Sequence, residues 1–287
     1  MGGAVVNGGK IFLVTGATDG IGRVTALKLA QTGAKIILVG RNADKGEQAV
    51  TEIKRASGNA GIEFERADLS SQQDIRFLAK RLDDRLPHLD VLVNNVGAWF
   101  NRRAMSPDGI EMTFALNHLG YFLLTGLLLK ILTREPAARI INVSSMAHRG
   151  RQINFDDPQG EENYSGWRAY QASKLANILF THHLAEKLAD RGVSVNCLHP
   201  GFVASKFAHN NGGWLKWMMI IGQQLIAINE EKGARTSAYL ATSPEVAGVS
   251  GKYFVKNRVA QSAALSYDRE AQESLWRLSE ELTGLSY

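Results

Sequence analysis

The stretch Ile11-Phe12-Leu13-Val14-Thr15-Gly16-Ala17-Thr18-Asp19-Gly20-Ile21-Gly22 decides the fold, because it joins an apolar run to a glycine-rich turn and then to an amphipathic segment. Glycines let the backbone approach a pyrophosphate, and the helix that follows offers free N–H groups and the positive end of its dipole. The spacing G-x-x-x-G-x-G differs from the G-x-G-x-x-G fingerprint, so a plain tight turn is the alternative. The candidate dinucleotide-binding residues of this turn are Gly16, Thr18, Asp19, Gly20, Ile21 and Gly22.

Apolar runs and amphipathic stretches alternate along the rest of the chain. Runs that are apolar on both faces suit parallel strands covered by helices on each side. We therefore predict an α/β fold with one doubly wound, Rossmann-type domain over residues 1–287, a parallel sheet of about seven strands, and helices on both faces. The expected strands include 11–14, 36–39, 91–93, 140–143 and 193–198, and the expected helices are 21–31, 45–56, 73–85, 107–132 and 168–190.

Composition narrows the kind of partner. The 287 residues carry a net charge of +5, and the basic residues are scattered, which favours a small anionic ligand over nucleic acid. Cys197 is the only cysteine, so no disulfide forms within the chain, and we expect a reducing, cytoplasmic location. The apolar segments 121–132 and 214–229 are shorter than the ~20 residues that span a bilayer, so we expect no transmembrane segment.

The expected second strand ends at Gly40-Arg41, where a dinucleotide fold meets the adenosine ribose. Gly40 leaves room there, and Arg41 suits a 2′-phosphate, which predicts NADP(H). The charge of Asp19 would oppose that phosphate, so NAD(H) is kept as the alternative. Asp68, followed by Leu69, is interpreted either as an acceptor for the adenine amino group or as a helix N-cap.

Polar residues also end the later strands, at the edge where open α/β sheets bind ligands. Asn95-Val96-Gly97 follows the fourth strand, and Ser144-Ser145 ends the fifth. The amides of the first group either contact the ligand or brace the loop. Asn117, inside an apolar helix, needs buried partners and either bridges structural elements or holds a catalytic water.

Tyr170 and Lys174 stand four residues apart in a run that is typical of a helix, so both side chains share one face. An ammonium close to a phenol favours the phenolate and lowers the tyrosine pKa. This spacing therefore predicts a general acid or base, with a surface aromatic packed on a lysine stem as the alternative.

In this order, T-G-x-x-x-G-I-G, N-N-x-G, a mid-chain Asn, V-S-S and Y-x-x-x-K resemble the short-chain dehydrogenase/reductase family over nearly the whole chain. The motifs Ser144-Ser145-Met146-Ala147-His148, S-K-L-A-N after Tyr170, and Gly248 to Phe254 resemble its retinol-dehydrogenase-like branch.

The resemblance implies a catalytic tetrad of Asn117, Ser145, Tyr170 and Lys174, because the branch places its serine 25 residues before the tyrosine. Tyr170 would exchange the proton with the substrate oxygen and Ser145 would hydrogen-bond that oxygen. Lys174 would tune Tyr170 and bind the nicotinamide ribose, and Asn117 would hold a water. The resemblance also implies further cofactor contacts from Pro200, Gly201, Val203 and Ser205. Ser205 stands where threonine is usual in the family.

These expectations give an NADP-dependent oxidoreductase that interconverts a hydrophobic alcohol and its aldehyde or ketone, with no metal. The alternatives are a steroid or polyketide-type ketoreductase, and a non-catalytic NADP(H)-binding sensor or scaffold. A substrate lid is expected at about residues 202–229, with Phe202, Trp214, Trp217 and Met218 as its candidate substrate contacts. The apolar helices 121–132 and 168–190 are compatible with a homodimer or homotetramer.

Overall fold

A computed structural model describes residues 9–150, 152–201 and 230–287, and in these ranges the strands form one eight-stranded sheet. The strand order is β3-β2-β1-β4-β5-β6-β7-β8, in which the first seven strands are parallel and β8 runs antiparallel to β7. The order reverses between β1 and β4, which creates the switch point where ligands bind in such sheets. The strands are β1 Ile11–Thr15, β2 Lys35–Gly40, β3 Ile62–Arg66, β4 Val91–Asn94, β5 Arg139–Val143, β6 Ser194–Leu198, β7 Lys252–Val255 and β8 Arg258–Ala260.

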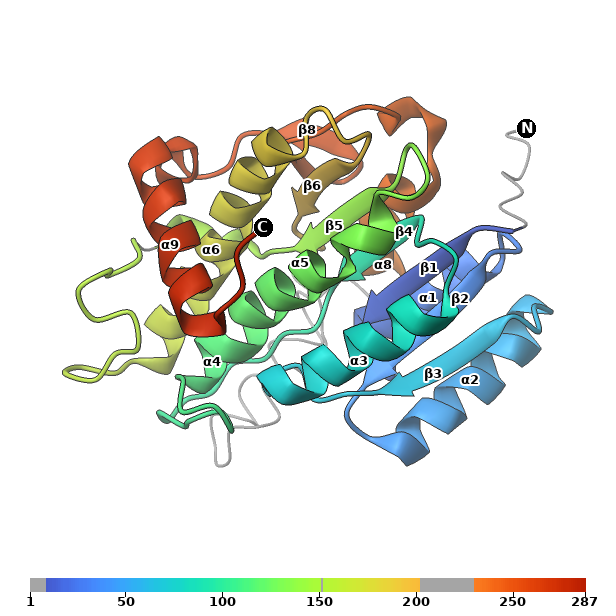
Figure 1. Ribbon diagram of the computed structural model, residues 1–287, viewed down its shortest axis with the longest axis horizontal. Coiled ribbons are helices and arrows are strands. Elements are labelled where there is room, and N and C mark those ends of the chain that lie inside the picture. The colour runs from blue at the N-terminus through green and yellow to red at the C-terminus, as the bar shows by residue number, and fades with distance from the viewer. Residues whose placement is uncertain (1–8, 151, 202–229) are drawn as a thin grey trace.

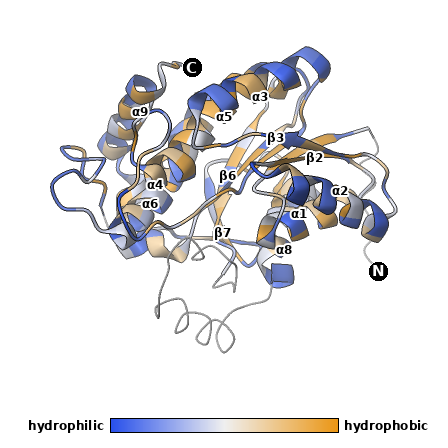
Figure 2. Ribbon diagram, turned by 90° about the horizontal axis from the view of Figure 1, so that it is seen from below, coloured by the Kyte–Doolittle hydropathy of each residue, from blue (hydrophilic) through white to orange (hydrophobic). Residues whose placement is uncertain are grey.

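Helices cover both faces of this sheet, with α3, α5, α6 and α9 on the face toward the viewer and α1, α2 and α8 on the other (Figure 1). Alternate residues of β1 supply the two cores: Leu13 packs toward α3 and α5, whereas Phe12 and Val14 pack toward α1 and α8. Figure 2 shows the same layering as hydrophobic strands between helices whose outer faces are hydrophilic. The helices are α1 Gly20–Ala30, α2 Ala43–Ser57, α3 Gln72–Arg85, α4 Met112–Phe114, α5 Gly120–Leu132, α6 Gly166–Lys187, α8 Glu230–Thr242 and α9 Arg269–Thr283.

The predicted α/β class and single doubly wound domain are confirmed, and two details differ. The sheet has one strand more than expected, because β8 is a short, mostly exposed strand without an apolar run. The predicted helix 107–132 begins at Met112, because the Glu111 carboxylate caps it by accepting hydrogen bonds from the Thr113 and Phe114 amides at 2.9 and 2.7 Å. A π-helical turn, Ala115–Leu119, then precedes α5, and it contains Asn117.

The helical segment Met112–Leu132 is long and apolar enough to cross a membrane by length and composition alone. In the structure, 83% of the most apolar 18-residue stretch of this helical segment is buried inside the protein. This is the burial expected of a central core helix, and the helix is longer than the apolar segment 121–132 considered in the sequence analysis.

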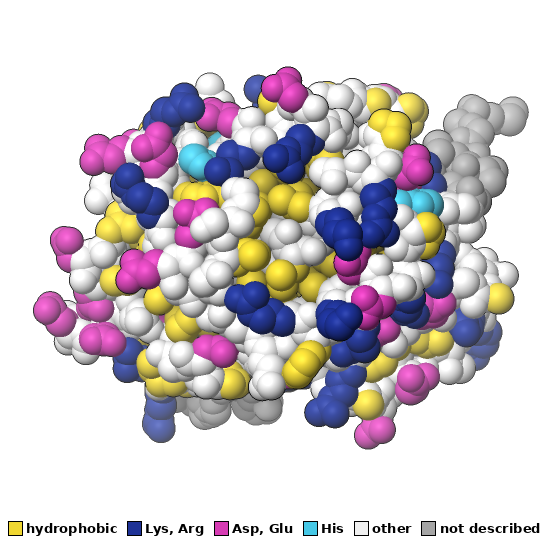
Figure 3. Space-filling view, in the orientation of Figure 1, with side chains coloured by type: hydrophobic (Ala, Val, Ile, Leu, Met, Phe, Trp, Pro, Cys, Tyr) yellow, Lys and Arg dark blue, Asp and Glu magenta, His cyan; other side chains and the backbone are white. Residues whose placement is uncertain are grey.

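The outer faces of α5 and α6 are largely covered by the C-terminal part of the chain. Trp276 of α9 packs against Phe122 and Phe180, and the Tyr287 hydroxyl donates to the Phe122 carbonyl at 3.0 Å. Hydrophobic side chains framed by Lys and Arg remain visible over α5 in Figure 3. Leu127 of α5 is only partly buried. Core burial therefore accounts for much of the apolar character of both helices, and the homodimer or homotetramer stays a prediction.

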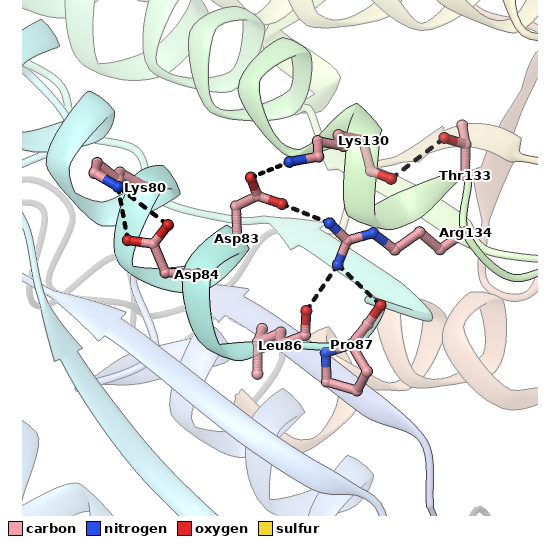
Figure 4. Close-up of polar contacts among 8 residues, drawn as sticks. All are labelled: Lys80, Asp83, Asp84, Leu86, Pro87, Lys130, Thr133 and Arg134. Atoms are coloured by element: carbon pink, nitrogen blue, oxygen red, sulfur yellow. Dashed lines mark hydrogen bonds and ion pairs between the residues drawn. The ribbon is translucent and has the colours of Figure 1, made fainter.

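The ends of α3 and α5 are joined by ion pairs centred on Asp83, which contacts Lys130 at 2.7 Å and Arg134 at 2.9 Å (Figure 4). Arg134 also donates to the Leu86 and Pro87 carbonyls at 2.9 and 3.0 Å. These groups face solvent, and exposed pairs contribute at most about 1 kcal/mol each. They fix where α5 ends beside α3, while the buried apolar contacts stabilise the layer.

Candidate active site

A groove of about 550 Å³ opens at the carboxyl ends of the strands around the switch point. It brings together the glycine turn after β1, the end of β2, the loop after β3 and the loop after β4. Every predicted cofactor-binding residue from the first hundred positions lines it: Gly16, Thr18, Asp19, Gly20, Ile21, Gly22, Arg41, Asp68, Leu69, Asn95, Val96 and Gly97.

The conformation of the turn after β1 requires glycine at its glycine positions. Gly16 and Gly20 have φ angles of 63° and 56°, and a Cβ on Gly22 would lie 2.2 Å from the Gly16 carbonyl oxygen. Asn95 holds this turn, because its side-chain amide donates to the Thr15 carbonyl at 2.8 Å and the Gly16 carbonyl at 3.4 Å. Of the two sequence interpretations of Asn95, its side chain therefore fits bracing.

Asp19 is the N-cap of α1, and its carboxylate accepts from the Gly20 amide at 2.9 Å. A capping carboxylate stabilises the first turn of a helix, which explains an acidic residue in a turn suited to anions. It also places a negative charge at the positive end of the α1 dipole, so it opposes phosphate binding there.

Two exposed cations, Arg41 and Lys45, line the groove after the end of β2. Neither Arg41 nor Lys45 makes a side-chain ion pair within the described ranges of the chain. Lys45 was missed by sequence reasoning, although its place three residues after the α2 N-cap, Asn42, was a usable signal. Gly40 lines the groove, and a Cβ there would lie 2.6 Å from Thr18 Cγ2, so this glycine also serves packing of the turn.

The Asp68 carboxylate is engaged in the turn that leads to α3. Its Oδ1 accepts from the Ser70 amide at 2.9 Å and from the Ser70 hydroxyl at 2.7 Å, while Ser71 is the N-cap of α3. The N-cap interpretation of Asp68 is therefore wrong, because the capping residue lies three positions further on. Asp68 still lines the groove, so its second oxygen suits a ligand amino group.

Ser145 and Tyr170 are brought together at the same edge of the sheet. The Ser145 side chain hydrogen-bonds the Tyr170 phenol, and both residues are only partly buried. The neighbouring Ser144 is buried, and its hydroxyl donates to the Lys174 carbonyl at 2.6 Å. The two adjacent serines therefore differ: Ser144 anchors α6, whereas Ser145 faces the phenol.

Lys174 and Asn117 meet beneath Gly97. The Lys174 Nζ and the Asn117 Oδ1 lie 3.1 and 3.5 Å from the position of a Cβ on Gly97, so any side chain there would intrude on both. The Lys174 ammonium donates to the Val143 carbonyl at 3.2 Å and lies 5.8 Å from the centroid of the Tyr170 ring. Lys174 and Asn117 thus lie beside the loop after β4, and the Tyr170 ring lies next to Lys174.

Asn117 is fully buried and bridges elements through its amide. Its Oδ1 accepts from the Ala98 amide at 2.9 Å, and its Nδ2 donates to the Ala98 carbonyl at 2.9 Å and to Ser173 Oγ at 3.0 Å. One lone pair of Oδ1 is left by these bonds. The geometry thus fits the bridging interpretation directly, and the role in holding a water stays a prediction.

The pKa values of Tyr170 and Lys174 differ from the expectation from sequence. Burial raises the pKa of the Tyr170 phenol, and the hydrogen bond from Ser145 opposes the rise. Burial also lowers the pKa of Lys174 to about 7. The expected lowering of the Tyr170 pKa by Lys174 is therefore absent in the isolated protein, because desolvation penalises both the phenolate and the ammonium.

The histidines near the site make structural hydrogen bonds to backbone groups. His148 Nε2 accepts from the Ala263 amide at 3.1 Å, so the Nδ1–H donates to the Ser145 carbonyl at 2.6 Å. His199 Nδ1 accepts from the Gly201 amide at 3.0 Å. Burial lowers the pKa of both histidines, so both are neutral near pH 7. His148 thereby fixes the backbone of Ser145 against the segment before α9.

The described residues give no group of three or more His, Cys, Asp or Glu side chains that could hold a metal ion. Pro200 and Gly201 follow β6, and Gly201 has a φ of 93°. The predicted lid 202–229, with Phe202, Val203, Ser205, Trp214, Trp217 and Met218, lies outside the described residues.

The low pKa of Lys174 predicts a pH dependence of stability. Between about pH 7 and the ordinary lysine value of ~10.4, the unfolded chain binds the proton and the folded chain does not, so unfolding free energy rises with pH. Lys174→Met lacks this group. In denaturant titrations without cofactor, wild type should gain on the order of 1–2 kcal/mol over Lys174→Met between about pH 7 and 9. Parallel pH profiles for the two proteins would contradict a buried ammonium.

Comparisons with known proteins agree with this geometry. A family model described as short chain dehydrogenase matches residues 10–216. The chain is 40% identical over 277 residues to human retinol dehydrogenase 11, covering 96% of this chain and 86% of the relative. It is 37% identical over 292 residues to human polyprenol dehydrogenase, covering 96% and 86%.

A solved structure titled Pseudomonas aeruginosa RhlG/NADP active-site complex is also similar, with a TM-score of 0.70 and 26% identity over 88% of this chain and 97% of that one. Fold, groove and relatives agree on an oxidoreductase that interconverts alcohols and carbonyl compounds. The chain belongs to the short-chain dehydrogenase/reductase family, in its retinol-dehydrogenase-like branch, and is an NAD(P)-dependent enzyme.

Proposed function

We propose that this protein uses NADP(H) to interconvert a hydrophobic alcohol and its aldehyde or ketone, with Tyr170, Ser145, Lys174 and Asn117 as the catalytic group. The observation that carries the proposal is the contact between the Ser145 hydroxyl, which follows β5, and the Tyr170 phenol on α6. Lys174 and Asn117 converge beside the same loop. These are the groups that a carbonyl oxygen needs as proton donor and hydrogen-bond donor.

In the reducing direction, Tyr170 donates its proton to the carbonyl oxygen while Ser145 donates a hydrogen bond to that oxygen. In the oxidising direction, the phenolate accepts the alcohol proton. A cationic Lys174 favours the phenolate, and its pKa of about 7 lets it hold or release a proton at working pH. The nicotinamide supplies or accepts the hydride.

The preference for NADP(H) is supported by Arg41 and Lys45, two exposed cations at the groove that make no side-chain ion pair within the described residues. A guanidinium binds a phosphate through two parallel hydrogen bonds, and an ammonium adds a point charge. The tight turn at Gly16 and Gly22 supports a pyrophosphate site, because these two positions carry no side chain of their own beside the N-terminal end of α1. The negative charge of Asp19 opposes phosphate binding. We therefore propose that NADP(H) is preferred and that NAD(H) binds more weakly but is still accepted.

A hydrophobic substrate is supported by the apolar surface beside the catalytic group. Met146, next to Ser145, and Trp167, three residues before Tyr170, are among the most exposed large hydrophobic side chains. The names of the two curated relatives point to retinol and polyprenol, which are long isoprenoid alcohols. The proposed substrate contacts in the lid stay predictions from sequence, as does the cytoplasmic location.

A cofactor-oxidation screen tests this proposal. With NADPH, kcat/KM should rise with chain length across linear aldehydes, because each buried methylene contributes ~0.8 kcal/mol. Retinoid and polyprenyl aldehydes should be at least as good, and NADH should be weaker. A best substrate that is a steroid or polyketide ketone would replace the substrate class. NADPH binding without turnover of any carbonyl compound would favour the non-catalytic sensor or scaffold.

A further inference from the structure

Trp167 lies one helical turn before Tyr170 on α6, so the two side chains share a face. Their rings are stacked, with centroids 5.7 Å apart and an interplanar angle of 25°. Trp167 is nevertheless 46% exposed. One face of the indole therefore packs on the catalytic phenol, and the remainder of the ring is open to a ligand.

Trp99 supports this indole from the loop after β4. Its ring meets that of Trp167 edge to face, with centroids 5.8 Å apart and an interplanar angle of 75°, and only 7% of Trp99 is exposed. Edge-to-face and stacked pairs are the favoured aromatic geometries. Trp167 is thus held in one orientation from two sides, by Trp99 and by Tyr170.

The backbone around this aromatic pair is also fixed. A Cβ on Gly166 would lie 2.0 Å from the Phe100 carbonyl oxygen, so the start of α6 and the loop after β4 touch through backbone. The Tyr164 hydroxyl lies 3.1 Å from that carbonyl and 3.0 Å from Glu111 Oε1, so it also ties this backbone to the N-cap of α4. Phe100 lines the cofactor groove on its other side. An aromatic surface therefore runs from the groove, past the phenol, to the open face of Trp167.

We propose that the open face of Trp167, supported by Trp99, binds the flat apolar part of the substrate next to the reacting carbonyl. This inference rests on the proposed function and names two residues that determine which hydrophobic substrates the enzyme prefers. A rigid planar surface stacks best on a planar partner, so the pair favours a conjugated or unsaturated chain over a saturated chain of equal length. Neither tryptophan was among the substrate contacts expected from sequence, which lie in residues 202–229.

The test compares Trp167→Ala and Trp167→Phe with wild type on three aldehydes: a conjugated polyene aldehyde, a saturated aldehyde of equal carbon number, and a short aldehyde. For the polyene, kcat/KM should fall about 10-fold or more in Trp167→Ala and be largely kept in Trp167→Phe. The short aldehyde should change less than about 3-fold. Phe77→Ala is the matched control, because Phe77 is an aromatic residue on α3 that is 56% exposed.

An equal loss for the short aldehyde and the polyene would overturn the proposal, because Trp167 would then act only by positioning Tyr170. A binding measurement separates this result from failure of the proposed function. With Tyr170→Phe as background, the dissociation constant of the polyene alcohol should rise about 10-fold when Trp167 becomes Ala, even if no carbonyl compound is turned over. An unchanged dissociation constant would also overturn it.

Discussion

Tyr170→Phe should lower kcat by about 10²- to 10⁴-fold while leaving the dissociation constant of NADPH nearly unchanged. The substitution removes one oxygen and keeps the ring, so the stack on Trp167 and the helix α6 are preserved. Burial raises the pKa of this phenol, which means that in wild type it carries its proton at neutral pH and is ready to donate it. Without the hydroxyl, the proton on the product oxygen has to come from water.

Tyr239→Phe is the matched control for this variant. Tyr239 lies on α8, and its hydroxyl donates to Glu245 at 2.9 Å, away from the groove. It should keep wild-type turnover. If Tyr170→Phe retained more than about a tenth of wild-type kcat when chemistry limits the rate, Tyr170 would not be the proton donor.

Arg41→Ala should weaken NADPH binding by roughly 10- to 150-fold and leave NADH binding nearly unchanged, as expected for one lost hydrogen bond to a charged group. The reason is that the Arg41 side chain makes no ion pair within the described residues and faces the groove, so its charge is available to a 2′-phosphate. Lys45→Ala should act in the same direction, and the double variant should lose more than either single one.

Asp19→Ser should act in the opposite sense and tighten NADPH binding, because serine keeps the N-cap of α1 and removes the negative charge. Arg55→Ala, at the far end of α2, is the control for removal of a cation. Isothermal titrations with both cofactors give the answer. An equal loss for NADPH and NADH in Arg41→Ala would show that Arg41 does not contact the 2′-phosphate.

The five strands whose bounds were predicted are apolar on both faces, as parallel strands under two helical layers have to be. The edge strand β3 has no such run, because Glu63 and Glu65 alternate with its apolar residues. The strand β8 was not predicted from the sequence, because it is short and exposed at an edge of the sheet, where no apolar run is needed. The start of α4 was placed five residues early for a related reason. The cap at Glu111 depends on a carboxylate folding back onto two amides, which a helical pattern in the sequence does not reveal.

The site positions were also visible as motifs, whereas the contacts of their side chains were not. Asn95 has the same place in a motif whether it touches a ligand or holds the Gly16 turn, and only the structure shows the second. The lowered pKa of Lys174 depends on its burial, which spacing alone does not give. Trp99 and Trp167 are far apart in sequence and meet only because the loop after β4 touches the start of α6.

The central claim is that hydride passes between NADP(H) and a hydrophobic carbonyl compound with Tyr170 as proton donor. Its most direct test is a single-turnover measurement with NADPH deuterated at the transferable position and a polyene aldehyde, in wild type and in Tyr170→Phe. We predict that wild type forms deuterated alcohol and that the variant forms it about 10²- to 10⁴-fold more slowly from an equally occupied cofactor complex. Alcohol formation at equal rates in both proteins, or no deuterium transfer by wild type to any hydrophobic aldehyde or ketone, would contradict the account.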